Sequence, residues 1–373
     1  QDKKIHSAKP YERLFEELFD EEEDEVQEAE TSSESSGDME EFRNFNPSLT
    51  LPLACSQLVS FAAERGIALG ERSAVKIFSA FCASRLIILN SKTIPLAQKL
   101  VGILGEFFGS AAYVDEYSGY RSAEDMMFKS SADGFKEKSA IACAVFDSPA
   151  STRTIHIAAL TGVVPGDISA FFMPFTRYIN FPADGSTITL SGSGNAENTF
   201  RISPNLWFVF VCAEGADISK TDPYIASVAA YLDIDLSVTA EREYKTEKDP
   251  FGYYQLRGSE RTARENYALD EERGWKRVDK LESYVKKHVA YSSDNKSWTR
   301  MEKYASVYLA CGGEQQDALD CTVASKMMLP VLTSPVKNGE GYDLLSAIDN
   351  AFGDDGAPEC KRVANDAGYA ANN

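Results

Sequence analysis

The segment RLIILNSKTIPLAQKLVGIL, residues Arg85–Leu104, contains the pattern that decides the fold. Its opening run, RLIIL, is continuously apolar, as expected of a strand buried on both faces of a parallel sheet. Its closing part, LAQKLVGIL, spaces apolar residues as an amphipathic helix does. The connection NSKTIP, residues 90–95, contains a lysine and a threonine but no glycine. The segment therefore predicts a strand, a turn and a helix in direct succession.

The alternation of strands and helices continues on both sides of this segment. The predicted strands are residues 86–90, 111–116, 154–160, 206–212 and 231–236, and the predicted helices are 53–66, 71–83, 94–108, 135–147, 166–179 and 223–230. A hairpin is expected over 186–202, where two β-rich arms flank an SGSG turn. This order favours an α/β fold with a doubly wound, mostly parallel, five-stranded sheet.

After Val238 the pattern becomes helical. Amphipathic helices are expected over 265–288, 297–310, 317–332 and 342–352, with Pro330 stopping the third. The expected organisation is an amphipathic N-terminal helix (1–19), an acidic disordered linker (20–47), an α/β domain (48–240), a second linker (241–261) and a helical domain (262–373).

The charge of the chain is concentrated near its start. The net charge is −19, and residues 1–50 alone hold 16 acidic and 5 basic side chains. An acidic chain without a basic stripe is a poor candidate for direct nucleic-acid binding, because phosphate contacts supply most of that affinity. No apolar run reaches membrane-spanning length, and no signal peptide is evident. We therefore expect a cytoplasmic protein that binds neither nucleic acid nor membrane.

A short apolar stripe precedes the acidic segment. In KPYERLFEELFD, residues 9–20, the side chains of Tyr11, Leu14, Phe15, Leu18 and Phe19 share one helical face. A helix over 11–19 on an acidic tether could serve as a docking peptide for a partner groove. The other interpretation is that this helix packs on its own domain, and the sequence does not choose between the two.

Few residues offer metal or nucleophile chemistry. The seven cysteines show no CxxC spacing, so buried free thiols in a reducing compartment are expected. The three histidines are far apart in sequence, which predicts no histidine-rich metal site. His156 lies between isoleucines and is expected to be a core histidine whose hydrogen bonds are satisfied. A stripe in the helix predicted over 166–179 is assigned to the core and consists of Phe171, Phe172, Met173 and Phe175.

The order of the motifs resembles that of the McrB-like AAA+ ATPases. SRLIIL (84–89) followed by LAQKLVGILGEFFG (96–109) resembles the strand and helix that flank the phosphate loop. TIHIAALTGVVPGDISAFFMPFTRYI (154–179) is similar to the second motif, and FRISPNLWFVFVCAEGAD (200–217) to the sensor-1 strand. The helical tail resembles the lid domain, with Arg300 at a sensor-2-like position. The resemblance spans about residues 50–367 and implies an α/β domain with a C-terminal helical lid.

The motifs that would carry nucleotide chemistry are not intact. The connection holding Lys92 and Thr93 is about three residues shorter than the family loop and lacks the glycines that let backbone N–H groups wrap phosphates. Where the family places Asp-Glu, this chain has Leu160, which cannot bind a metal, and Thr161, which cannot act as a base near neutral pH. Cys212-Ala213-Glu214 replaces the sensor asparagine, and Glu214 is expected to be solvated. No catalytic residue and no metal ligand is predicted.

Three functions follow as hypotheses. The first is a catalytically inactive module that acts as a scaffold with a protein partner, either an active AAA+ subunit or further copies of itself. The second is a nucleoside triphosphatase that binds ATP or GTP with magnesium through Lys92, Thr93 and Arg300, with carboxylates supplied by a neighbouring subunit. Under the first hypothesis Arg300 pairs with an acid, either Glu302 or a residue of the α/β domain. The third is a stand-alone protein-interaction module.

Overall fold

The computed structural model describes residues 44–130, 136–180, 187–191, 197–240, 251–337, 339–354 and 356–368. Residues Asn46–Asn373 form one compact unit. The helix expected over 11–19 and nearly all of the linker expected over 20–47 lie outside the described residues. None of the seven cysteines is in a disulfide, and five of them are buried. Among the helices that the structure describes, none combines the length and apolarity needed to cross a membrane.

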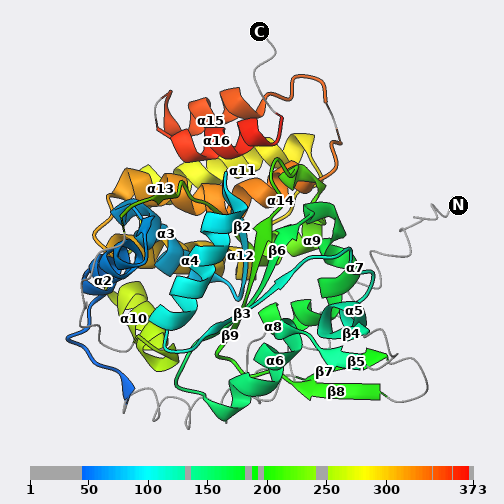
Figure 1. Cartoon of the computed structure of the whole chain (residues 1–373). Coiled ribbons are helices and arrows are strands. Elements are labelled where there is room, and N and C mark those ends of the chain that lie inside the picture. The colour runs from blue at the N-terminus through cyan, green and yellow to red at the C-terminus, as the bar shows by residue number, and fades with distance from the viewer. Residues whose placement is uncertain are drawn as a thin grey trace, which may run out of the picture. The chain divides into compact units, whose positions relative to one another are not determined.

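A five-stranded parallel sheet forms the centre of this unit (Figure 1). Its strands are β2 (Leu86–Asn90), β3 (Ala112–Glu116), β6 (His156–Val163), β9 (Leu206–Cys212) and β10 (Ala230–Asp233). Their spatial order is β10-β2-β9-β6-β3, and every neighbouring pair is parallel. Numbered along the chain, the strand order is 5-1-4-3-2. The connection that leaves β2 and the connection that leaves its neighbour β9 therefore run in opposite directions across the sheet. This confirms the predicted α/β fold. We call the edge where these strands end the carboxyl edge, and the opposite one the amino edge.

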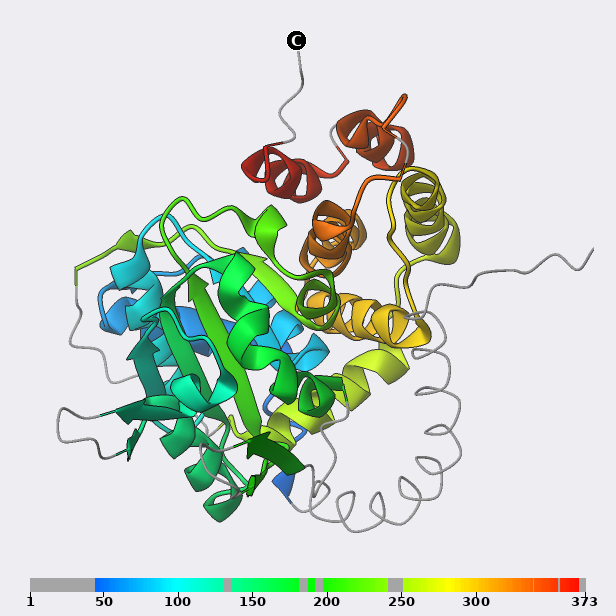
Figure 2. The ribbon, with the colours of Figure 1, turned by 90° about the vertical axis from the view of Figure 1, so that its right-hand side faces the viewer.

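Helices cover both faces of the sheet. The helices that precede or connect its strands are α2 (Leu51–Glu64), α3 (Glu71–Ala83), α4 (Ile94–Phe107), α5 (Ala123–Met127), α6 (Ala140–Asp147), α7 (Ile168–Phe172), α8 (Thr176–Asn180) and α9 (Pro223–Val228). The connection from β2 to β3 runs across the sheet in the opposite direction to those that follow β3. Because parallel crossovers are right-handed, α4 covers one face, and α6 and α8 cover the other. Figure 1 shows the sheet between α4 and the helices α7 and α9, and Figure 2 views it from the side of α7 and α9.

The region after the sheet is helical. Its elements are α10 (Tyr253–Asn266), the π-turn η5 (Glu271–Trp275), α11 (Lys276–His288), α12 (Asn295–Ala310), α13 (Gln315–Val323), the π-turn η6 (Ala324–Met328), α14 (Leu329–Thr333), α15 (Leu344–Phe352) and α16 (Pro358–Asp366). The helix expected over 265–288 is divided, since α10 ends at Asn266 and α11 begins at Lys276. Most of α10 thus lies in the stretch 241–261 that we assigned to a linker.

Prolines account for two further differences from the expected helices. The helix expected to stop at Pro330 continues to Thr333, because η6 resets the hydrogen bonding and places Pro330 in the first turn of α14, where a missing N–H is tolerated. The single helix expected over 166–179 is broken into α7, a 3-10 turn at Met173–Phe175 that contains Pro174, and α8. Of the Phe/Met stripe there, the phenylalanines are buried, but Met173 is 41% exposed.

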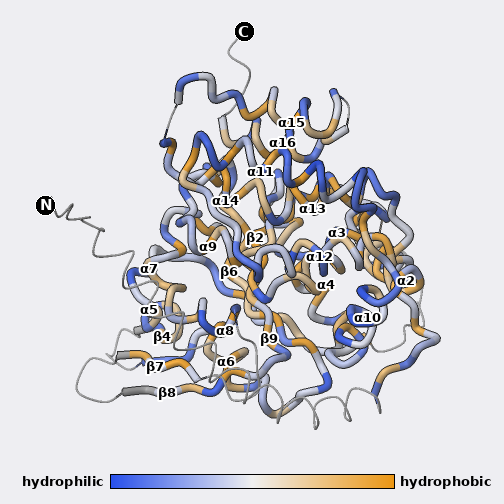
Figure 3. Tube along the Cα trace, turned by 180° about the vertical axis from the view of Figure 1, so that it is seen from behind, coloured by the Kyte–Doolittle hydropathy of each residue, from blue (hydrophilic) through white to orange (hydrophobic). Residues whose placement is uncertain are grey.

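Three small antiparallel pairs complete the described structure. The predicted hairpin is confirmed as β7 (Thr187–Ser191) and β8 (Glu197–Arg201), with its SGSG turn largely outside the described residues. Two further pairs were not predicted, namely β4 (Phe128–Ser130) with β5 (Lys136–Lys138) and β1 (Ile67–Ala68) with β11 (Ser237–Val238). Figures 1 and 3 both show the first two hairpins side by side, and the Phe128 and Phe200 rings lie 6.2 Å apart.

A glycine allows the close approach of α4 to β3. A Cβ atom added at Gly105 would lie 2.3 Å from the backbone nitrogen of Ala112, whereas one added at Gly102 of the same helix meets nothing within 4 Å. We expect Gly105→Ala to lower the free energy of unfolding by about 1–3 kcal/mol through overpacking. Gly102→Ala should raise it by roughly 0.5–1 kcal/mol. Urea unfolding of both variants checks this, and equal effects would contradict the close packing.

Candidate functional site

The loop between β2 and α4 is the place where the sequence suggested a phosphate cradle. It contains only Ser91, Lys92 and Thr93 between the end of β2 and the start of α4. Ser91 is buried, and Thr93 caps the helix in an extended conformation without a side-chain capping bond. Pro95 occupies the first turn of α4 and removes one of the N–H groups that a helix N-terminus offers to an anion. The loop therefore presents few backbone donors.

Lys92 lies on the surface at this loop. Its ammonium forms an ion pair with Asp235 at 3.0 Å, and the two side chains are 88% and 65% exposed. The hydrogen bond to Asp235 raises the pKa of Lys92. A pair this exposed is screened by water and contributes little to stability.

The ends of β6 and β9 carry no carboxylate in the positions where nucleotide hydrolysis would need one. Leu160 and Thr161 are buried, and the Thr161 hydroxyl donates to the Asp115 carbonyl at 3.3 Å. Cys212 is buried at the end of β9, and burial raises the pKa of its thiol to about 12. Glu214 is exposed, as expected. No group of three or more metal-type side chains that could hold an ion is found in the part of the chain that the structure describes.

Arg300 lies at the opposite edge of the sheet from Lys92. It is buried in α12, and its guanidinium donates to the Asn180 side-chain oxygen and to the Ser227 carbonyl at 3.4 Å. Lys326 is also buried and donates to the Ala229 carbonyl at 2.5 Å. Both side chains thus donate to carbonyls at the C-terminal end of α9, just before β10 begins at the amino edge. Arg300 does contact the α/β region, but it donates there to an amide oxygen and a carbonyl, whereas pairing with an acid was expected.

The structure therefore brings Lys92 and Thr93 together but not Arg300. Asp235, the partner of Lys92, follows the end of β10, whereas Ser227 precedes the start of that strand. Four strand residues span about 13 Å at ~3.3 Å per residue. The sequence could not reveal this separation, because spacing along the chain does not say at which edge of a sheet a distant helix docks.

A cluster of charged side chains joins α3, β10, α13 and α16 at the carboxyl edge. We call it the carboxyl-edge ion cluster, and it consists of Arg72, Lys76, Asp233, Asp317, Glu359 and Arg362. Glu359 is at its centre, where its two oxygens accept from Arg72 at 2.5 Å, Lys76 at 3.1 Å and Arg362 at 2.6 Å. Arg362 also pairs with Asp233 at 3.1 Å, and Arg72 pairs with Asp317 at 2.5 Å.

The acids of this cluster respond differently to their surroundings. Burial acts to raise the pKa of Glu359, but Lys76, Arg362 and Arg72 together lower it to about 2. For Asp233 burial dominates and raises the pKa, although Arg362 and Lys76 oppose it. Glu359 is thus the member most firmly held as an anion. Sequence reasoning missed the cluster, and the one available signal was Lys76 within the otherwise apolar run AVKIF of α3.

The depressed pKa of Glu359 makes part of the stability sensitive to acid. A group whose pKa falls on folding stabilises the protein above its unfolded pKa and loses that contribution as the pH falls towards its folded pKa. As the pH falls from 4.5, the ordinary pKa of the group, towards about 2, the free energy of unfolding of the wild type should therefore fall by about 2–3 kcal/mol more than that of Glu359→Gln. Urea unfolding at about pH 6 and about pH 3 measures this difference. Parallel losses in the two proteins would contradict it.

His156 is buried in β6, as expected, but only one of its ring nitrogens has a partner. Nε2 lies 3.2 Å from the Thr154 hydroxyl, while Nδ1 has no hydrogen-bond partner among the described residues. Burial lowers the pKa of His156.

Two surface hollows of about 410 and 360 Å³ lie in the helical region, and neither is lined by residues of the β2–α4 loop.

The strand order and the helical region after the last strand define an α/β protein with an AAA+-like architecture. No protein-family model matches the chain. No curated protein matches it either. Among solved structures, the chain is similar to a crystal structure from Cytophaga hutchinsonii ATCC 33406 described as a "putative ATPase", with 9% identity and a TM-score of 0.45 over 88% of this chain and 97% of that one. A likeness at that level carries no argument about function, so the class rests on the strand order.

Proposed function

We propose that this chain is an AAA+-like module of McrB type that has lost nucleotide chemistry and serves as an assembly or scaffold component. The observation that carries the proposal is the loop after β2, which has three residues, no glycine and a proline in the helical turn behind it. Phosphate binding by this fold requires a run of backbone N–H groups wrapped around the anion, and such a loop is too short to supply it.

The rest of the carboxyl edge supports the same conclusion. Hydrolysis needs a magnesium ligand and a carboxylate that polarises water, and β6 has Leu160 and Thr161 where the family places its two acids. Asp235 pairs with Lys92 of the loop, and both Asp235 and Asp233 are already paired with Arg362. Arg300 would have to act from the amino edge, where it caps α9.

The helical region is fastened to the α/β region at both ends of β10, which suits a scaffold. At the amino edge, Arg300 and Lys326 of the helical region bond to the α/β region. At the carboxyl edge, the carboxyl-edge ion cluster joins the same two regions. Such a frame presents a constant surface to a partner. The partner is an active AAA+ subunit or a second copy of this chain, and residues 11–19 are the proposed docking peptide for a further protein.

The scaffold proposal predicts an assembly that does not respond to nucleotide. We expect light scattering after size exclusion to report the same oligomeric mass with and without Mg-ATP or Mg-GTP. A mass that changes only with nucleotide would contradict the proposal. A monomer at every concentration, alone or with cell extract, would instead favour the stand-alone interaction module.

A nucleoside triphosphatase with shared catalytic groups is the second candidate, because Lys92 and Thr93 do follow β2 directly and Lys92 is exposed. In that case ATP or GTP would bind with magnesium, and carboxylates would come from a neighbouring subunit. Phosphate release per chain would then rise with protein concentration and disappear in Lys92→Ala. Release that stays at the level of the buffer at all concentrations would exclude this candidate.

A further inference from the structure

Three cationic side chains converge on one buried carboxylate in this protein. The side chains of Glu359 and Lys76 are only 10% and 9% exposed, so water does not screen their contact. Arg72 donates to one oxygen of Glu359, and Lys76 and Arg362 donate to the other. Two guanidinium groups and one ammonium around a single anion is the arrangement with which proteins bind phosphate and carboxylate ligands.

The position of this convergence is also that of a ligand site. The Lys76 ammonium donates to the Asp233 carbonyl at 2.8 Å, and Asp233 pairs with Asn90, the last residue of β2. Glu359 therefore lies at the carboxyl edge, beside the loop that contains Lys92. Open α/β sheets bind their ligands outside the carboxyl ends of the strands, where the strand order reverses.

Helix α16 places Glu359 in this position. The backbone N–H groups of Glu359 and Cys360 donate to the buried Asp320 carboxylate of α13 at 2.8 and 3.0 Å. These bonds satisfy two donors of the first turn of α16 and fix its start. The Glu359 carboxylate of the helical region thus lies against Arg72 and Lys76 of α3.

We propose that Glu359 is a built-in anion that fills an oxyanion site formed by Arg72, Lys76 and Arg362, and that a phosphate-class oxyanion occupies this site when the carboxylate is removed. Without Glu359, Arg72 keeps Asp317, and Arg362 keeps Asp233 and Asp235. Lys76 keeps only the Asp233 carbonyl among the contacts of the described residues. Among the members of the cluster three cations then face two acids, and a small oxyanion restores the negative charge that was removed.

The experiment is a rescue of Glu359→Ala by inorganic phosphate. Thermal unfolding is followed in sodium phosphate and in sodium chloride of equal ionic strength. Glu359→Ala should melt below the wild type in chloride, and its Tm should rise in phosphate by about 2 °C for each tenfold excess over Kd. Phosphate also stabilises folded proteins in general, so the gain is measured relative to the wild type.

Two variants serve as controls. Glu106→Ala removes a surface acid that forms an ion pair with Arg65, and it should show only the general effect of phosphate. Lys76→Met combined with Glu359→Ala should abolish the specific gain. If Glu359→Ala does not fold in chloride, the yield of folded protein after refolding in phosphate and in chloride replaces the Tm.

An equal gain in the wild type, in Glu106→Ala or in the double variant would overturn the proposal. So would the absence of any gain in Glu359→Ala. The inference does not rest on the proposed function, because the wild type could bind nucleotide through Lys92 and still show this pattern.

Discussion

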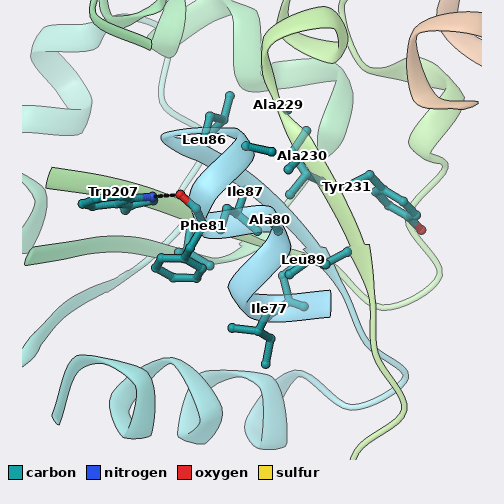
Figure 4. Packing of buried hydrophobic residues seen from close by; sticks show 14 of the residues in the cluster. Ile77, Ala80, Phe81, Leu86, Ile87, Leu89, Trp207, Ala229, Ala230 and Tyr231 are labelled. Atoms are coloured by element: carbon teal, nitrogen blue, oxygen red, sulfur yellow. Dashed lines mark hydrogen bonds between the residues drawn. The ribbon is translucent and has the colours of Figure 1, made fainter. Parts of the chain in front are cut away.

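Trp207→Ala is expected to lower the free energy of unfolding by about 3–5 kcal/mol, the largest effect of a single substitution that we anticipate. Trp207 is fully buried in β9 near the amino edge (Figure 4). Its indole N–H donates to the Phe81 carbonyl at 3.0 Å, and the Phe81 ring stacks on it at 5.9 Å. The Arg85 guanidinium lies 3.6 Å from the ring centroid. The residue thus joins β9 to α3 and to the start of the segment that decides the fold.

Urea unfolding with two controls tests this expectation. Trp207→Phe keeps a ring but loses the hydrogen bond, and we expect it to lower the free energy of unfolding by about 1–3 kcal/mol. Tyr267→Ala removes an aromatic ring that is 45% exposed and should change stability by about 0.5 kcal/mol or less. If Trp207→Ala behaved like Tyr267→Ala, the junction between β9 and α3 would not be the anchor that the structure indicates.

Lys326→Met is expected to change how stability depends on pH. Burial lowers the pKa of Lys326 well below its ordinary 10.5, and the positive charge of Arg300 lowers it further. Between these two pKa values the unfolded chain binds a proton that the folded chain does not. The stability of the wild type therefore rises with pH in this interval, by about 1.4 kcal/mol per pH unit, and Lys326→Met lacks this dependence.

The measurement is the free energy of unfolding of both proteins at a series of pH values from about 7 to about 10, over which the difference should shift in favour of the wild type as the pH rises. Lys280→Met is the control for losing a lysine, because Lys280 also donates to a carbonyl, that of Asn350, but on the surface. A difference that is constant with pH would mean that Lys326 is charged in the folded protein.

Local patterns predicted the sheet well. The strands Leu86–Asn90 and Leu206–Cys212 and the helix Glu71–Ala83 have the predicted bounds. Each is a continuous apolar run or a clear helical stripe, so the signal lies within the element itself. The π-turn η6 and the broken helix before Asn180 were missed, because a proline position does not by itself say whether a helix stops, shifts its hydrogen bonds or restarts.

The candidate site was less accessible to sequence reasoning. The short loop with Lys92 and the missing carboxylates at Leu160 and Thr161 could be identified, because each lies next to a recognisable strand. The position of Arg300 at the amino edge could not, since it depends on how α12 docks. The carboxyl-edge ion cluster could not either, because its members come from four separate elements that only tertiary packing brings together.

The central claim is that this chain has an AAA+-like fold but does not bind nucleotide. Isothermal titration calorimetry of the full chain with Mg-ATP and with Mg-GTP tests it most directly, with Lys92→Ala titrated in parallel. The account predicts only heats of dilution for both nucleotides and both proteins. Micromolar binding to the wild type that disappears in Lys92→Ala would contradict it.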